Sequence, residues 1–96
     1  MKKELVVLKD GDWSLNLEDE YYERHPEDVF AESVDAIRRT KAGHCVNLVT
    51  PGGLGDPREW LIPQLITLVR YADLPVREIR YVDECGCGGH VTRVYR

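Results

Sequence analysis

The chain has 96 residues, a formal net charge of −4 and 43% hydrophobic residues. Its length predicts a single domain spanning residues 1–96, and its apolar content argues against disorder. The acidic balance argues against a nucleic-acid partner, and the longest apolar runs are too short to cross a membrane. Because there are three cysteines and no signal peptide, we expect a cytoplasmic protein rather than a disulfide-stapled secreted one.

The first predicted elements are two strands joined by a turn. Residues 4–8 form a short apolar run, Asp10-Gly11 is a strong hairpin signal, and residues 13–17 alternate apolar with polar side chains. The charged residues 18–24 should then form a loop or a short helical turn.

A helix over residues 26–42 follows this segment. Pro26 suits the first helical position because its missing N–H is not needed there, and Gly43 suits the position after the helix end. Residues 44–50 are rich in β-branched and apolar side chains, which predicts a strand.

A glycine-rich turn, residues 52–55, separates this strand from a second helix. Asp56 followed by Pro57 is typical of a helix N-terminus, and the apolar pattern continues to about Ala72. Pro63 lies deep enough in that helix to predict a kink. Glycine-rich turns before helices can bind anions, but the Lys-Ser/Thr of a phosphate-binding loop is missing, so we interpret residues 52–55 as a tight turn.

Two more strands close the chain, over residues 76–84 and 90–96. The glycine-rich residues 85–89 between them predict a hairpin that carries this run at its tip. The order is therefore β(β)αβαββ. It predicts an α/β domain, at the boundary with α+β, whose sheet of four to five strands has a parallel core and two helices packed on one face. The other face would be left open to a partner.

The most informative feature is the run Cys85-Gly86-Cys87-Gly88-Gly89, which holds two of the three cysteines and three of the eight glycines. Glycine loses the most conformational entropy on ordering and buries no side chain, so core packing does not explain the run. Paired thiols flanked by glycine point either to chemistry or to an unusual turn.

One such chemistry is the binding of zinc or another thiophilic metal. Cys85, Cys87 and His90 are ligand types that zinc prefers, but structural zinc sites use four ligands. The fourth would be Cys45 or His44, which are adjacent on a predicted strand and cannot both face the site. Cys45 is better explained as a small buried core residue, and His44 as a solvent-facing strand residue.

A second chemistry is thiol redox, as in thioredoxin-like enzymes. Reactive dithiols favour Cys-x-x-Cys at a helix N-terminus, whereas Cys85 and Cys87 are one residue closer and lie between strands. Four arginines bracket the run and would favour the thiolate if they lay near it, although solvated strand residues explain them more simply. They are Arg77, Arg80, Arg93 and Arg96.

The run from Cys85 to Gly89, followed by His90-Val91-Thr92-Arg93-Val94, resembles the CGCGG family of small proteins. These are targets of a radical S-adenosylmethionine (SAM) maturase and precursors of ribosomally made, post-translationally modified peptides. The resemblance implies a substrate rather than an enzyme, with no catalytic residues, no cofactor of its own and a radical SAM maturase as partner. The oligomeric state stays open.

The resemblance also implies what happens at the motif. The maturase would abstract a hydrogen from an α or side-chain carbon, and a cysteine sulfur would close a thioether there, with Cys85 and Cys87 as the sulfur donors. The modified residues would be Cys85, Gly86, Cys87, Gly88 and Gly89. As a further alternative, Gly88-Gly89 could act as a protease signal or a sulfur-carrier end, but residues 90–96 follow it, so either role needs cleavage first.

Overall fold

The computed structural model describes residues 8–84 and 88–96 of the chain. The predicted tip of the final hairpin, residues 85–87, and most of the first predicted strand lie outside the described residues. The elements are β1 (Trp13–Asn16), α1 (Glu20–Arg24), α2 (Pro26–Arg38), β2 (Cys45–Thr50), the 3₁₀ helix η1 (Gly52–Leu54), α3 (Leu61–Tyr71), β3 (Glu78–Glu84) and β4 (His90–Tyr95).

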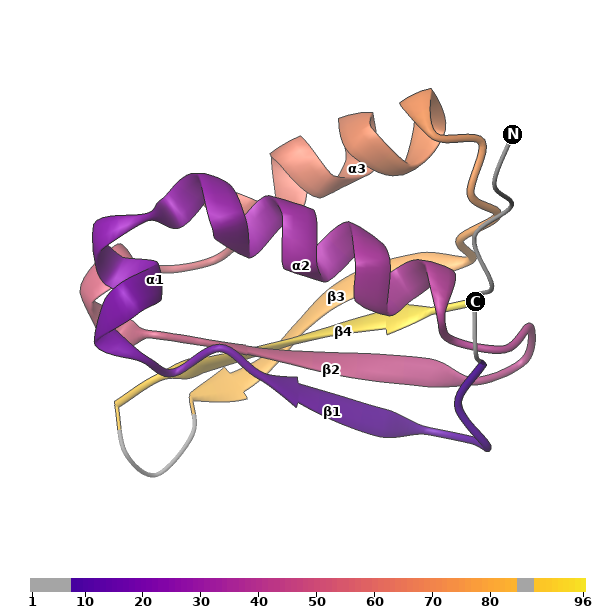
Figure 1. Cartoon of the computed structure of the whole chain (residues 1–96), viewed down its shortest axis with the longest axis horizontal. Coiled ribbons are helices and arrows are strands. Elements are labelled where there is room, and N and C mark those ends of the chain that lie inside the picture. Colours follow the sequence, from indigo (N-terminus) through magenta and orange to yellow (C-terminus); the bar gives the residue numbers. More distant parts are fainter. Residues whose placement is uncertain (1–7, 85–87) are drawn as a thin grey trace, which may run out of the picture.

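The four strands form one mixed sheet in the order β1-β2-β4-β3. β1 pairs with β2 in parallel, whereas β4 pairs antiparallel with both β2 and β3. Helices α2 and α3 lie on one face of this sheet (Figure 1), which confirms the predicted α/β domain. The parallel core is smaller than expected, because β4 lies between β2 and β3 and limits parallel pairing to β1 and β2.

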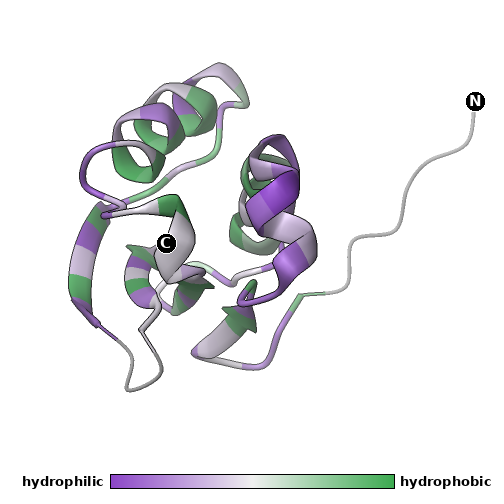
Figure 2. Cartoon of the chain, turned by 90° about the vertical axis from the view of Figure 1, so that its left-hand side faces the viewer, coloured by the Kyte–Doolittle hydropathy of each residue, from purple (hydrophilic) through white to green (hydrophobic). Residues whose placement is uncertain are grey.

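The core lies between the helices and the sheet. Alternate strand residues face it, and Figure 2 shows the same alternation of apolar and polar residues along β3, the strand that leads into the grey segment. The fully buried cluster comprises Leu17, Val29, Ile37, Val46, Leu48, Leu61, Leu65 and Val94. Neither helix, nor any other helix in the described ranges, is long and apolar enough to cross a membrane.

The opposite face of the sheet carries no helix among the described residues (Figure 1), and polar side chains lie on it beside apolar ones such as the paired Val49 and Val91. Asn47 links two neighbouring strands there: its amide nitrogen donates to Ser14 Oγ at 3.3 Å, and its carbonyl oxygen accepts from Arg93 Nε at 2.7 Å. Arg93 also donates to Tyr95 Oη at 3.4 Å. This chain of contacts runs across β1, β2 and β4, so the predicted open face is present and carries a polar network.

The predicted first hairpin stays a prediction, because most of its first strand lies outside the described residues. Lys9 lies outside any strand, and its N–H donates to the Arg39 carbonyl at 2.9 Å. Among the described residues β1 pairs with β2 alone. The charged segment after β1 forms the short helix α1, with Asp19 as its N-cap. This confirms the short helical turn, one of the two alternatives predicted for residues 18–24.

Helix α2 ends at Arg38, four residues before the predicted end. Thr40 is fully buried, donates its hydroxyl to the Ala36 carbonyl at 2.8 Å and accepts from Trp13 Nε1 at 2.9 Å. This contact with β1 fixes the chain just after the helix. Gly43, with a φ of +87°, serves the turn into β2 instead of a helix cap.

Helix α3 starts at Leu61, not at Pro57 as predicted. Asp56 does act as a cap, but of the preceding turn, where its carboxylate accepts from the Arg58 backbone at 2.9 Å. The later start places Pro63 in the first helical turn, where an N–H has no intrahelical partner. The predicted kink at Pro63 is therefore wrong, because no helical hydrogen bond is lost there.

Candidate modification site

The described part of the motif sits where the last strand begins. Glu84 and His90 pair across the β3–β4 hairpin, and His90 also pairs with Thr50 at the end of β2. The motif therefore connects two strands of the sheet beside the turn that follows β2. Three of its residues, Cys85, Gly86 and Cys87, lie outside the described residues, so their predicted role as modified residues remains a prediction.

Gly88 and Gly89 have different surroundings. Gly88 is exposed, has a φ of +93°, and has open space where a β carbon would stand. Gly89 is buried, and a β carbon on it would lie 2.7 Å from the Thr50 carbonyl oxygen and even closer to the Glu18 carboxylate. The second glycine is thus enclosed by the end of β2 and by the segment after β1.

The glycine-rich turn after β2 packs against this part of the motif. A β carbon on Gly52 would overlap the carbonyl oxygen of Gly88, and one on Gly53 would lie 2.6 Å from the Glu23 carboxylate. The sequence predicted a tight turn here, and η1 is such a turn. Its contact with Gly88 was not predicted, although the repetition of a Gly-Gly pair in the two loops was a visible signal.

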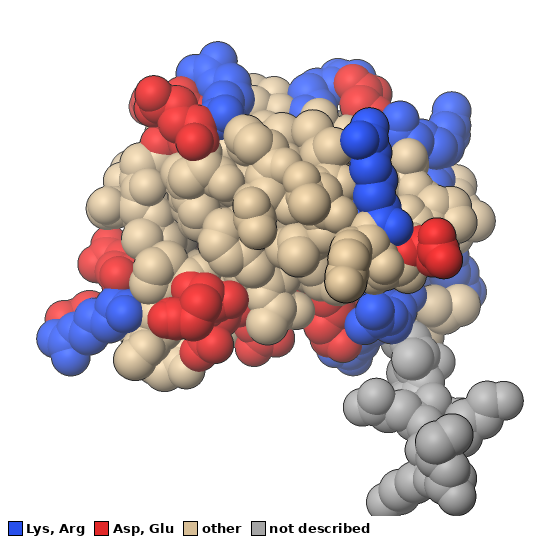
Figure 3. Space-filling view, turned by 90° about the horizontal axis from the view of Figure 1, so that it is seen from above, with Lys and Arg blue, Asp and Glu red and all other residues tan. Residues whose placement is uncertain are grey.

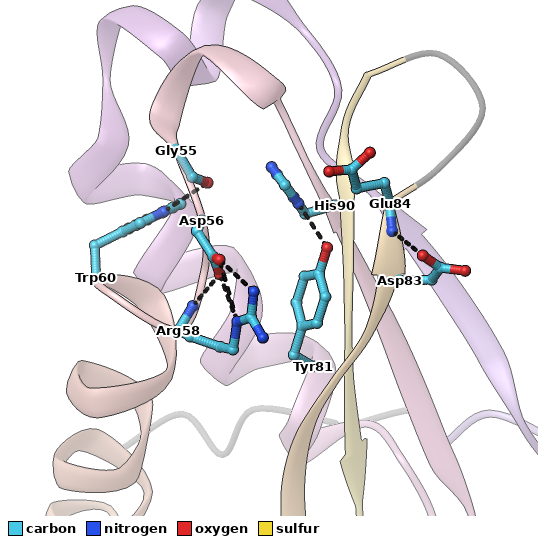
Figure 4. A network of polar contacts seen from close by, with 8 residues as sticks. All are labelled: Gly55, Asp56, Arg58, Trp60, Tyr81, Asp83, Glu84 and His90. Atoms are coloured by element: carbon cyan, nitrogen blue, oxygen red, sulfur yellow. Dashed lines mark hydrogen bonds and ion pairs between the residues drawn. The ribbon is translucent and has the colours of Figure 1, made fainter.

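A network of polar contacts continues from the motif toward α3 (Figure 4). The Nδ1 atom of His90 lies 3.0 Å from Tyr81 Oη on β3. The guanidinium of Arg58 stacks 4.4 Å from the centre of the Tyr81 ring and donates to both carboxylate oxygens of Asp56. These hydrogen bonds from Arg58 lower the pKa of Asp56 to about 2. Three groups from two segments, Tyr81 on β3 and the Asp56–Arg58 pair before α3, thus form the network next to the His90 side chain.

The surroundings of the motif are acidic. Asp83 and Glu84 precede Cys85 in the chain, and on the other side an open hollow of about 200 Å³ borders the Gly52 turn. It is lined by Glu18, Asp19, Glu20, Glu23, Pro51 and Gly52. Negative charge opposes the ionisation of a thiol. Viewed from the helix side, basic side chains are more concentrated at the right-hand end, opposite the motif (Figure 3).

Three of the four arginines that bracket the motif in the sequence have side-chain partners elsewhere. Arg80 pairs with Glu78 at 3.0 Å, and Arg93 with Asn47 on the open face. Arg96 Nη1 donates to the Ile37 carbonyl at the C-terminal end of α2. These contacts favour the simpler interpretation of the arginines as structural or solvated charges.

Cys45 and His90, two of the predicted metal ligands, are not brought together. Cys45 pairs with Tyr95 at one end of β2, whereas His90 pairs with Thr50 at the other, about 16 Å away at a rise of roughly 3.3 Å per residue. Cys45 is 7% exposed, and burial raises the pKa of its thiol. His44 Nδ1 lies 3.2 Å from Asp12 at that same distant end of the sheet.

A metal centre would therefore have to be built without Cys45 or His44. Within residues 8–84 and 88–96, His, Cys, Asp and Glu side chains form no group of three that could hold an ion. Cys85 and Cys87 are outside these ranges, so a site formed by them with His90 stays a prediction.

Comparison of the sequence with known proteins relates the chain to one protein family. No curated protein and no solved structure shows significant similarity to the chain. Over residues 4–96, however, it matches the family described as "Putative radical SAM target protein". The match covers the folded domain as well as the Cys-Gly run, and so extends far beyond residues 85–94, on which the resemblance rested. The chain therefore belongs to this family.

Proposed function

We propose that the chain is the substrate of a radical SAM maturase and is modified within Cys85-Gly86-Cys87-Gly88-Gly89. Membership of the target family over residues 4–96 carries this proposal, because it concerns the domain and the motif together. The geometry supports it: the motif links two strands of a packed sheet, an arrangement in which a rigid scaffold carries a functional loop. In this role the chain is not an enzyme, works in the cytoplasm and has no cofactor of its own.

The proposed modification is a thioether between a cysteine sulfur and a carbon of the chain. The radical derived from SAM removes one hydrogen atom from that carbon, the thiol loses a proton, and one electron passes to the enzyme. A carbon–sulfur bond forms at the expense of one C–H and one S–H bond. Each thioether thus lowers the mass of the chain by two hydrogen atoms.

The acidic flanks of the motif fit a substrate better than a redox enzyme. Redox cysteines depend on a stabilised thiolate, which cations or a helix N-terminus supply. Here Asp83 and Glu84 directly precede Cys85, and β3 and β4 flank the motif in place of a helix. Thiols kept protonated are spared spontaneous oxidation until an enzyme acts on them.

The test is intact-mass analysis of the chain co-produced with the radical SAM enzyme of its native host. We expect a loss of two hydrogen atoms per thioether and a matching loss of alkylatable thiols after reduction. A Cys85→Ser or Cys87→Ser variant should lose a modification, whereas Cys45→Ser, altered at the far end of β2, should keep all of them. Unchanged mass with three alkylatable thiols, in chain isolated from the native host, would overturn the proposal.

One observation favours a second function, a zinc or other thiophilic-metal site formed by Cys85, Cys87 and His90. Metal-ligating histidines usually donate their second ring N–H to a partner, and Tyr81 Oη stands 3.0 Å from Nδ1 of His90, which leaves Nε2 as the ligand atom. Stoichiometric zinc in unmodified protein, lost in Cys87→Ser but kept in Cys45→Ser, would support this function. Retention of zinc in Cys87→Ser would exclude it.

A further inference from the structure

The backbone at the end of the motif approaches the rest of the domain closely at two places. The Gly88 carbonyl occupies the space that a β carbon on Gly52 would need, and Gly89 fills the space between the Thr50 carbonyl and the Glu18 carboxylate. Real β carbons essentially never come this close to a backbone oxygen. Positions 52 and 89 therefore require glycine because neighbouring atoms leave no room for a β carbon, and not because of their backbone torsion angles.

Gly88 is required for a different reason. Its φ of +93° lies in the region that L residues rarely adopt, while nothing stands within 4 Å of its missing β carbon. A D residue favours a φ of this sign, as the mirror image of the preference of an L residue. The three glycines thus act together: Gly88 turns the chain so that its carbonyl meets Gly52, and Gly89 enters the buried position next to β2.

We propose that Gly52, Gly88 and Gly89 form a glycine seat that positions the motif for modification. The motif then has two parts: Cys85-Gly86-Cys87 is the segment acted upon, while Gly88-Gly89 is the anchor and is neither modified nor cleaved. The role in maturation rests on the proposed function, but the seat itself does not. The anchor also explains why Gly89 is unsuited to a protease signal, since proteases need accessible backbone and Gly89 is buried.

The first test of the seat needs no maturase. In Gly52→Ala, the added methyl group must displace the Gly88 carbonyl, so hydrogen exchange of the amides of residues 88–91 should become about tenfold faster. Gly53→Ala is the matched control, because it changes the same loop in the same way but meets only the end of the exposed Glu23 side chain, which can swing aside. Equal exchange in the two variants would overturn the seat.

A second pair of variants tests the backbone conformation at position 88 through the chirality of the residue placed there. Cys85 allows native chemical ligation of a residue 1–84 thioester to a synthetic residue 85–96 peptide, so either enantiomer of alanine can be placed at this position. D-Ala should leave the exchange of residues 88–91 as in the natural chain, whereas L-Ala should accelerate it about tenfold. Equal behaviour of the two enantiomers would contradict the assigned role of the torsion.

The positioning role is tested with the host maturase. The yield of modified product should fall at least several-fold in Gly52→Ala and with L-Ala at position 88, and should be preserved in Gly53→Ala and with D-Ala. Tandem mass spectrometry should find the mass loss confined to residues 85–87. A modification on Gly88 or Gly89, or an unchanged yield despite accelerated exchange, would overturn the positioning role. Absence of modification in the natural chain would instead overturn the proposed function. The hydrogen-exchange measurements would still test the glycine seat, because they need no maturase.

Discussion

Tyr81 and His90 face each other across the β3–β4 hairpin, with Oη and Nδ1 3.0 Å apart and their rings tilted at 51°. His90 is the first residue after the Cys-Gly motif, so this contact joins the motif to the polar network that includes Arg58 and Asp56. The hairpin is thus held by side chains as well as by its backbone ladder.

Removing the Tyr81 hydroxyl should weaken the hairpin next to the motif. In Tyr81→Phe, the hydrogen bond to His90 is lost, and we expect the free energy of unfolding to fall by about 0.5–1.5 kcal/mol. Urea titration followed by tryptophan fluorescence measures this change. Tyr71→Phe is the control, because Tyr71 is 92% exposed and should change stability by less than about 0.5 kcal/mol. Equal effects of the two substitutions would show that the His90 contact contributes nothing.

The Asp56–Arg58 pair should make stability depend on pH in the acid range. The pKa of Asp56 is lowered from 3.8 to about 2, chiefly by the side-chain hydrogen bond from Arg58. A carboxyl with a depressed pKa in the folded state contributes stability above its unfolded pKa and loses it as pH falls to the folded value. The unfolding free energies of the natural chain and of Asp56→Asn should therefore converge between about pH 4 and pH 2. Parallel curves across this range would contradict the assignment.

Two buried threonines should respond differently to the same change. Thr40 is hydrogen-bonded to Ala36 and Trp13, so Thr40→Val leaves the Trp13 N–H without this acceptor and should cost about 1–3 kcal/mol. Thr92 is fully buried, and its hydroxyl has no hydrogen-bond partner among the described residues. Thr92→Val should therefore be neutral or stabilising by about 1 kcal/mol, which thermal and urea unfolding measure. A loss of stability in Thr92→Val would reveal a partner for its hydroxyl.

Cys45 should behave as an inert core thiol. Burial raises its pKa and limits access of reagents, so its alkylation in the folded chain should be at least about tenfold slower than in urea. The Cys85→Ser/Cys87→Ser double variant isolates this thiol, and mass spectrometry follows its labelling. Rapid labelling in the folded state would mean that the β2 end near Asp12 opens readily.

Local patterns in the sequence predicted most elements because each depends on nearby residues. Pro26 marked the start of α2, and the β-branched run marked β2. The predicted end of α2 and start of α3 are wrong, because side-chain contacts beside these helix ends decide where the helices stop and begin. Helix α2 stops early because Thr40 is held by Trp13 on β1, and α3 starts late because Asp56 is engaged with Arg58 in the turn before it.

The sequence by itself determined the α/β class, the family resemblance and the motif, because these reside in local periodicity and in contiguous residues. Only the tertiary structure decided that β4 lies between β2 and β3. That insertion, which depends on packing between segments far apart in the chain, places His90 beside Thr50 and the Gly88 carbonyl against Gly52. It also places Cys45 at the opposite end of the sheet from His90. Strand order and register are settled by burial of one sheet face against both helices, a physical constraint that no single segment of sequence contains.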